Sequence, residues 1–252
     1  MTPAALGLVA ALGLGELAVI PRQRVLVIST GSELVAAGTA LQPGQIYESN
    51  AVMLAAAVSD AGAEVVGVVT CDDDVARFTA LLDSHAGQTD LIITSGGVSA
   101  GAYEVVKDAL GGGSGPNRGV EFVKVAMQPG MPQGAGRTPG GSAIVTLPGN
   151  PVSALVSFEV FIRPALRAAM NFVQPKRPHR TAVLAEDLTS PSGKRQFRRG
   201  VYNPADGTVV SYGPPASHHL RWLASANCLL DIAEDITELA AGEQVELWDL
   251  HP

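Results

Sequence analysis

The chain has 252 residues, enough for one large domain or two of unequal size. With 46% hydrophobic and 16% charged residues, it has the composition of a protein with a real core and not that of a disordered chain. The 17 basic and 24 acidic residues leave a formal charge of −7, which argues against non-specific nucleic-acid binding. Cys71 and Cys228 are the only cysteines and show no CxxC spacing, which is typical of a reducing compartment and predicts a cytoplasmic protein.

The apolar stretch at the N-terminus predicts a helix and not a targeting segment. Thr2 suits an N-cap, Pro3 suits the first helical position, and Gly13 and Gly15 would end the helix. No basic residue precedes Arg22, and no apolar run reaches the roughly 20 residues that span a bilayer. We expect this helix to supply core or subunit-contact surface.

Apolar, β-branched runs then alternate with segments of helical spacing. The expected helices cover residues 50–61, 74–84 and 151–170, and the expected strands cover residues 24–29, 64–70, 90–95, 121–126 and 142–147. This alternation predicts an α/β fold with a mostly parallel sheet, which binds ligands at the carboxyl ends of its strands. Two glycine-rich stretches, residues 111–119 and 134–141, are expected to be surface loops.

The pattern changes after residue 171, where residues 174–178 suggest a linker. Beyond it come short β-type runs at residues 181–184, 196–202, 208–212, 226–232 and 244–248, with a strong turn signal at residues 203–207. A small β-barrel or sandwich fits this second module.

Acidic residues follow the first two strands. Glu33 lies in the STGSEL turn, where a carboxylate could bind a metal ion or a ligand hydroxyl but is as readily solvated. Asp72, Asp73 and Asp74 precede a helix, so one of them suffices as a cap. Three adjacent carboxylates repel one another, however, so a nearby divalent ion or lysine is as good an interpretation as capping alone.

Two loops after later strands are suited to an anionic ligand. The SGGVSAG loop, residues 95–101, has glycines that let backbone N–H groups approach an anion. In the LPGNPVS segment, Asn150 suits an N-cap, Pro151 the first helical position and Ser153 the first turn, which makes a helix start suited to phosphate. Together they indicate a phosphorylated small molecule.

Other polar residues support several interpretations. The stretch at residues 194–200 contains four basic residues and suits either a solvated face or an anion-binding strand. His218 and His219 would point to opposite faces of a strand, so a surface or supporting role is expected and not a shared metal.

Six motifs in order resemble the molybdopterin molybdenumtransferases of the MoeA and gephyrin E-domain type. They are STGSEL (29–34), PGQIYESN (43–50), DDD (72–74), SGGVSAG (95–101), MQPGMP (127–132) and LPGNPVSALVSFEVFIRP (147–164). The resemblance implies a three-layer α/β/α molybdopterin-binding domain over residues 24–171 and a small C-terminal β domain over residues 177–252. Residues 1–20 would then be the remnant of an N-terminal linker domain.

The resemblance also implies an activity: insertion of molybdate into adenylylated molybdopterin, giving molybdenum cofactor and AMP, by a cytoplasmic homodimer with Mg²⁺. The metal would lie at Glu33, Asp73 and Asp74, and the catalytic residues would be Glu33, Asp74, Glu104 and Lys124. The substrate-binding residues would be Thr30, Gly31, Ser95, Gly96, Gly97, Ser99, Gly101, Pro148, Gly149, Asn150, Pro151, Ser153, Arg198 and Ser217.

Two departures from the family pattern stand out. The family's KPGKP-type loop here has Gln128 and Met131 in place of basic residues, and the chain begins near the end of the family's N-terminal region. Two alternatives therefore stay open: a molybdopterin-binding module without catalysis, and an enzyme like the molybdopterin adenylyltransferases.

Overall fold

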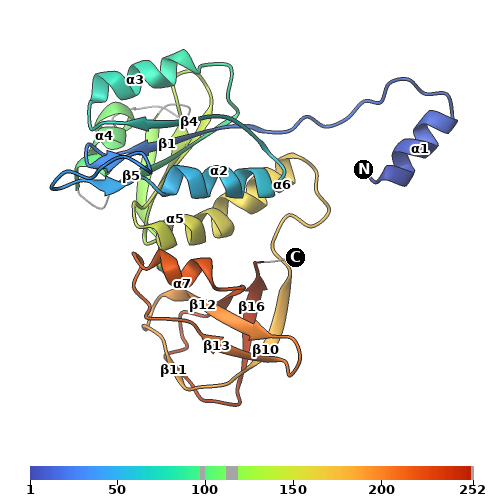
Figure 1. Cartoon of the computed structure of the whole chain (residues 1–252), viewed down its shortest axis with the longest axis vertical. Helices are drawn as coiled ribbons and strands as arrows, with labels where there is room; N and C mark the ends of the chain where they lie inside the picture. The colour runs from blue at the N-terminus through green and yellow to red at the C-terminus, as the bar shows by residue number, and fades with distance from the viewer. Residues whose placement is uncertain (97–99, 112–118, 251–252) are drawn as a thin grey trace.

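The structure, a computed structural model, describes residues 1–96, 100–111 and 119–250, with the backbone alone for residues 100–104. It consists of an α/β part, a β-barrel packed beneath it, and a helix that stands apart at the N-terminus (Figure 1).

The α/β part is built on a six-stranded sheet in the order β4-β1-β5-β9-β8-β6. Strands β4, β1, β5 and β9 run parallel, whereas β8 is antiparallel to both of its neighbours. This confirms the expected mostly parallel sheet. The bounds are β1 Arg24–Thr30, β4 Glu64–Cys71, β5 Leu91–Gly96, β6 Gly119–Lys124, β8 Pro132–Arg137 and β9 Ala143–Leu147.

Helices cover both faces of this sheet, as the resemblance implied. One face packs against α2 (Asn50–Asp60), α5 (Pro151–Ser157), the π-helix η1 (Phe158–Ile162) and α6 (Arg163–Ala169); the other packs against α3 (Val75–Ser84) and α4 (Ala100–Leu110). Along β1, Val25 and Val27 join the first core while Leu26 and Ile28 join the second. Both faces of the strand are buried, which is why its sequence shows no polar alternation.

The expectation of a surface loop over residues 134–141 is wrong for residues 134–137, whereas residues 138–141 form the turn between β8 and β9. Residues 132–137 form β8, which is paired along its length between β9 and β6. Glycines disguise this strand because its neighbours approach too closely for side chains: a Cβ on Gly134 would lie 2.9 Å from the Phe122 ring. In the other glycine-rich stretch, residues 112–118 lie outside the described residues.

The C-terminal part is a closed barrel. Its strands pair in the order β13-β10-β16-β14-β12, and β12 also pairs with β13 to close the ring. Each of the five strands expected in this region is present: β10 His179–Leu184, β12 Arg195–Asn203, β13 Thr208–Ser211, β14 Cys228–Ile232 and β16 Gln244–Asp249. The predicted turn joins β12 to β13 with Gly207 at φ 73°. A short ladder of β11 (Leu188–Thr189) and β15 (Glu238–Leu239) lies outside the ring.

The two parts are joined by backbone and by core. Strand β7 (Met127–Gln128) leaves the α/β part and pairs in parallel with β12 of the barrel. A shared apolar cluster unites Val152 and Val156 of α5 with Phe197 and Trp248 of the barrel and with Leu223 of α7 (Leu220–Ala224). The barrel is therefore fixed against the start of α5, beside the carboxyl edge of the sheet.

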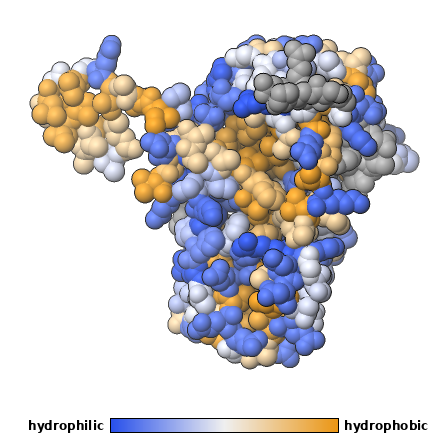
Figure 2. All heavy atoms as spheres, turned by 180° about the vertical axis from the view of Figure 1, so that it is seen from behind, coloured by the Kyte–Doolittle hydropathy of each residue, from blue (hydrophilic) through white to orange (hydrophobic). Residues whose placement is uncertain are grey.

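Helix α1 (Pro3–Ala11) lies away from the rest of the chain, as an apolar surface in Figure 2. Its start matches the prediction, because the Thr2 hydroxyl accepts a hydrogen bond from the Ala5 amide at 3.2 Å. None of its residues is buried in this chain. Within the described part of the chain, no helix combines the length and apolar content that a bilayer crossing requires.

Candidate active site

The carboxyl ends of three parallel strands open onto one pocket of about 240 Å³. The last residues of β1 and β5 and the loop after β9 line it, together with the short β2–β3 pair (Leu34–Val35 with Ile46–Tyr47) and the segment that follows it. The lining residues are Ser29, Leu34, Ile46, Tyr47, Glu48, Ser49, Asn50, Ser95, Gly96, Gly149, Asn150, Pro151 and His218. Five of the expected substrate-binding residues therefore share one cavity: Ser95, Gly96, Gly149, Asn150 and Pro151.

Glu48 organises the inner wall of this pocket. Its Oε1 accepts hydrogen bonds from the Ser29 hydroxyl at 2.8 Å and from the Ala51 amide at 2.7 Å. The Ser29 hydroxyl also lies 3.1 Å from the hydroxyl of Ser95 on the neighbouring strand. Glu48 thus ties the first turn of α2 to the ends of β1 and β5.

The start of α5 is already in use by the barrel. Asn150 occupies the N-cap position that the sequence predicts, but its side chain makes no capping hydrogen bond. The amide of Val152 donates to the carbonyl of Ser217 at 3.1 Å. The Ser217 carbonyl therefore occupies one first-turn donor, which is not available to an anion. Ser153 is buried at this turn, and Pro148 precedes the pocket residue Gly149.

The acidic turns after β1 and β4 lie against each other. Asp73 accepts hydrogen bonds from the amide and the hydroxyl of Ser32, at 3.2 and 3.1 Å. Asp74 is the N-cap of α3, and its Oδ1 accepts from the Arg77 amide at 2.9 Å. The predicted capping role of this acidic turn is therefore confirmed for Asp74. These bonds use only one carboxylate oxygen of Asp73 and one of Asp74.

Glu33 lies in the same region. Its carboxylate packs over Gly31, where an added Cβ would be 2.7 Å from Oε2. Asp72 forms an ion pair with Arg77 at 2.6 Å, which draws it toward α3. Thr30 ends β1 fully buried, and no described residue bonds its hydroxyl.

The acidic turns do not form a complete metal cage. Among the described residues, no three His, Cys, Asp or Glu side chains are grouped so as to hold a metal ion. Mg²⁺, however, usually takes one or two protein carboxylates and completes its shell with water and substrate phosphate. Asp73 and Asp74, on one turn with an oxygen each to spare, fit that mode and not an all-protein site.

Lys124 is far from these acids within the chain. It ends β6, an edge strand that lies four strand spacings from β1, or roughly 19 Å across the sheet. Its side chain is exposed. Gly97 and Ser99 lie outside the described residues, and Gly101 and Glu104 fall in the part of α4 whose side chains are not described.

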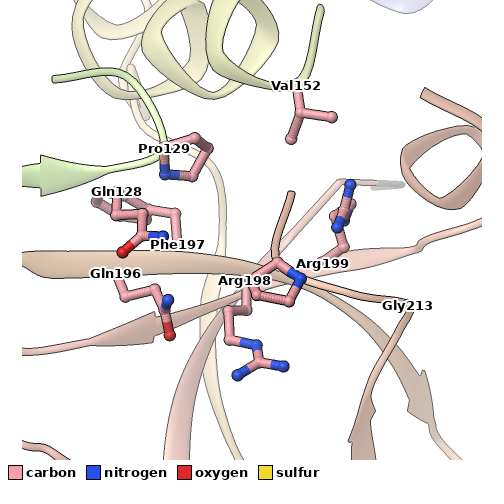
Figure 3. A pocket seen from close by; sticks show the side chains of 9 residues that line it. Gln128, Pro129, Val152, Gln196, Phe197, Arg198, Arg199 and Gly213 are labelled. Atoms are coloured by element: carbon pink, nitrogen blue, oxygen red, sulfur yellow. The ribbon is translucent and has the colours of Figure 1, made fainter. Parts of the chain in front are cut away.

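A second, much smaller cavity lies between β7 and β12. Figure 3 shows it lined by Gln128, Pro129 and Val152 from the α/β part and by Gln196–Arg199 and Gly213 from the barrel. Its volume is about 10 Å³, room for roughly one water molecule. An oxyanion the size of molybdate would need this junction to open.

The basic stretch of residues 194–200 separates into distinct roles along β12. Arg198 and Arg199 extend to opposite sides of the strand (Figure 3). Arg199 donates to the backbone carbonyls of Pro214, Ala216 and His219, so it holds the loop that covers α5. Within the described residues, Arg198 donates only to the Thr189 carbonyl, at 3.1 Å. Burial lowers the pKa of Arg198, because the guanidinium is partly desolvated.

His218 reaches the larger pocket from the barrel side. It lies in the loop before α7 and not in a strand, and its ring meets that of His219 edge to face, 4.1 Å between centroids. Sequence reasoning did not select Glu48, Asn50 or His218. The first two lay within the PGQIYESN motif, but nothing local indicates that this motif folds back onto β1 and β5.

Comparison with known proteins gives the class of this protein. The family model "Probable molybdopterin binding domain" matches residues 26–168, and the model "MoeA C-terminal region (domain IV)" matches residues 181–250. The chain belongs to the molybdopterin-binding family and combines that domain with a MoeA-type C-terminal barrel.

Individual relatives narrow the assignment. Molybdopterin molybdenumtransferase 2 of Mycobacterium tuberculosis is 72% identical over 99% of this chain, and the molybdopterin molybdenumtransferase of Haemophilus influenzae is 34% identical over 98%. A crystal structure of the molybdopterin biosynthesis MoeA protein from Pyrococcus horikoshii superimposes over the whole chain with a TM-score of 0.82 at 27% identity. The chain spans 62%, 61% and 60% of the lengths of these three proteins, respectively.

Proposed function

We propose that this chain acts in molybdenum cofactor biosynthesis as a molybdopterin molybdenumtransferase. It would take adenylylated molybdopterin and molybdate and release molybdenum cofactor and AMP. The observation that carries the proposal is the meeting of the ends of β1 and β5 and the loop after β9 in one pocket, beside the acidic turns after β1 and β4. The 72% identity to a protein of that name supports it.

The parts of the site suit different parts of such a substrate. Sites that enclose a whole drug-sized ligand have volumes of roughly 300 to 1,000 Å³. At about 240 Å³, this pocket would hold only one part of the substrate. The acidic turns lie on the β4 side of the sheet, where a metal-bound phosphate can be held. Arg198, on the barrel side, offers N–H donors to an oxyanion.

Mg²⁺ fits the turn of Asp73 and Asp74, where it would neutralise phosphate charge and so favour cleavage of the bond to AMP. The protein residues orient the ligand. Glu33 and Asp74 would face the phosphate end of the ligand. Arg199 holds the 213–219 loop over α5 and so fixes the barrel side of the site relative to the pocket. Lys124 lies far from the acidic turns within one chain. It would therefore reach the ligand only from the second subunit of the homodimer that we also propose.

A direct assay tests the proposal. The purified chain is incubated with adenylylated molybdopterin, molybdate and Mg²⁺, and AMP release is measured together with activation of an apo-molybdoenzyme. We expect both. Absence of AMP release at any Mg²⁺ concentration would reject catalysis by this chain.

Calorimetry separates the two alternatives. Tight molybdopterin binding without AMP release would indicate a binding module. ATP consumption would indicate an adenylyltransferase-like enzyme. We propose a cytoplasmic homodimer; sedimentation and cell fractionation test these two points independently.

A further inference from the structure

Asn50 is the buried polar residue of the larger pocket whose hydrogen bonding is incomplete. It is 9% exposed, and its Nδ2 donates to the Gly149 carbonyl at 2.7 Å. A carbonyl oxygen can only accept, so the end of the amide that faces Gly149 is the NH2 group and the other end is Oδ1. No described residue donates to Oδ1.

An acceptor buried without a donor lowers stability by about 1–3 kcal/mol, and such groups are rare in folded proteins. Asn50 lines the pocket, so a ligand in it is the natural donor. The missing partner must carry an N–H or O–H directed at the amide oxygen.

Glu48 supplies a second acceptor two residues away. It lines the same pocket, and the bonds that fix it to Ser29 and Ala51 both use Oε1. Its other oxygen keeps its accepting capacity. Tyr47 and His218 add ring surfaces to the wall, which suit a flat heterocycle.

We propose that Asn50 determines ligand specificity by accepting, at Oδ1, an N–H of the 2-amino group of a 2-amino-4-oxopyrimidine ring, with Glu48 accepting the adjacent ring N–H. That donor face is common to pterins and guanine. The inference rests on the proposed function in taking the pterin as the ring, and it orients the substrate: ring in the pocket, phosphates toward the acidic turns.

Two matched ligand pairs test the inference on the full chain by calorimetry. Pterin is compared with lumazine, in which an oxo group replaces the 2-amino group. Guanosine monophosphate is compared with inosine monophosphate, which lacks that amino group. We expect the chain to bind pterin at least about tenfold more tightly than lumazine, the effect of one buried acceptor left without a donor. Preference confined to the guanosine pair would support the role of Asn50 but name a guanine nucleotide as the ligand.

Variants locate the effect at Asn50. Asn50→Leu should abolish the pterin preference, whereas Asn50→Asp, which keeps an acceptor, should retain it. Loss of the bond to Gly149 would weaken pterin and lumazine equally, so the ratio of the two affinities reports recognition and not structure. Should Asn50→Leu fail to fold, Glu48→Gln provides a second test. It turns the acceptor of the ring N–H, which pterin and lumazine share, into a donor, so it should weaken both ligands several-fold and leave the ratio of their affinities unchanged. A lost preference in Glu48→Gln would assign the amino group to Glu48 and overturn the role of Asn50.

The outcomes separate this inference from the proposed function. An unchanged ratio in Asn50→Leu, or no preference in the parent chain up to millimolar ligand, would overturn the inference even if AMP is released in the turnover assay. A preference lost in Asn50→Leu but without AMP release would support the inference and reject the enzymatic proposal.

Discussion

Arg177 and Glu159 form a buried, two-pronged ion pair between the linker and the π-helix η1. Nε and Nη2 of Arg177 each donate to a different oxygen of Glu159 at 2.9 Å, and the two side chains are 7% and 3% exposed. Arg177 also donates to Asp60 at the end of α2. Burial would lower the pKa of Arg177, but the Glu159 hydrogen bonds raise it.

Removal of this pair should be costly. Glu159→Ala leaves Arg177 buried with only the half-exposed Asp60, so we expect a loss of about 3 kcal/mol in the free energy of unfolding. Urea denaturation measures it. Arg77→Ala, which breaks the exposed pair with Asp72, is the control and should cost less than about 1 kcal/mol. Equal losses in the free energy of unfolding would show that the buried pair stabilises the fold no more than an exposed pair does.

Asp74 is both a helix cap and a candidate metal ligand, and two substitutions separate these roles. Asn caps as well as Asp, so Asp74→Asn should leave the melting temperature nearly unchanged while turnover falls at least roughly tenfold, more than substrate affinity does. Asp74→Ala should lose turnover and, in addition, about 1 kcal/mol of stability. Full turnover in Asp74→Asn would reduce the residue to a cap.

Gln128 lies in the cavity with Arg198, whereas Met131 does not line it. We therefore expect Gln128→Lys to lower the KM for molybdate several-fold, by placing a second cation beside Arg198. Met131→Lys adds the same charge outside the cavity and serves as the matched control. If both variants change the KM alike, general charge and not this cavity governs molybdate binding.

The glycines of β8 give a stability test. An added Cβ at Gly136 would collide with the backbone of Gly119 on the paired strand, so Gly136→Ala should lower the free energy of unfolding by about 2 kcal/mol. Gly15, with no atom within 4 Å of an added Cβ, is the control and should tolerate alanine within about 0.5 kcal/mol. An unaffected Gly136→Ala would contradict the close pairing of β6 with β8.

The ionisation of Asp90 should make the free energy of unfolding depend on pH in the acid range. The hydrogen bonds from the Arg24 side chain, chiefly, hold the pKa of Asp90 below its ordinary value of 3.8. The stabilising contribution is therefore fully present above the unfolded-state pKa and is lost as pH falls through the folded-state pKa. Thermal unfolding followed from about pH 6 to about pH 3 should show a shallower acid decline in Asp90→Asn than in the parent. Asp83→Asn, an exposed carboxylate on α3, should follow the parent.

The amino-acid sequence by itself determined the features that depend on neighbours in the chain. Apolar β-branched runs marked β1 and β5 because both of their faces are buried. Asp74 and Asn150 marked the first turns of α3 and α5, since caps are chosen by short-range geometry. The barrel strands and the turn at residues 203–207 followed from short β-type runs and turn chemistry.

Only the tertiary structure decided which residues meet. Strand order places Lys124 far from Glu33 within one chain and brings Glu48, Asn50 and His218 to one pocket. It also makes a strand of glycine-rich residues 132–137, because pairing on both sides supplies the hydrogen bonds that local propensity does not favour. Contacts between residues far apart in the chain depend on how elements pack, and that packing energy has no signature in any short window of the sequence.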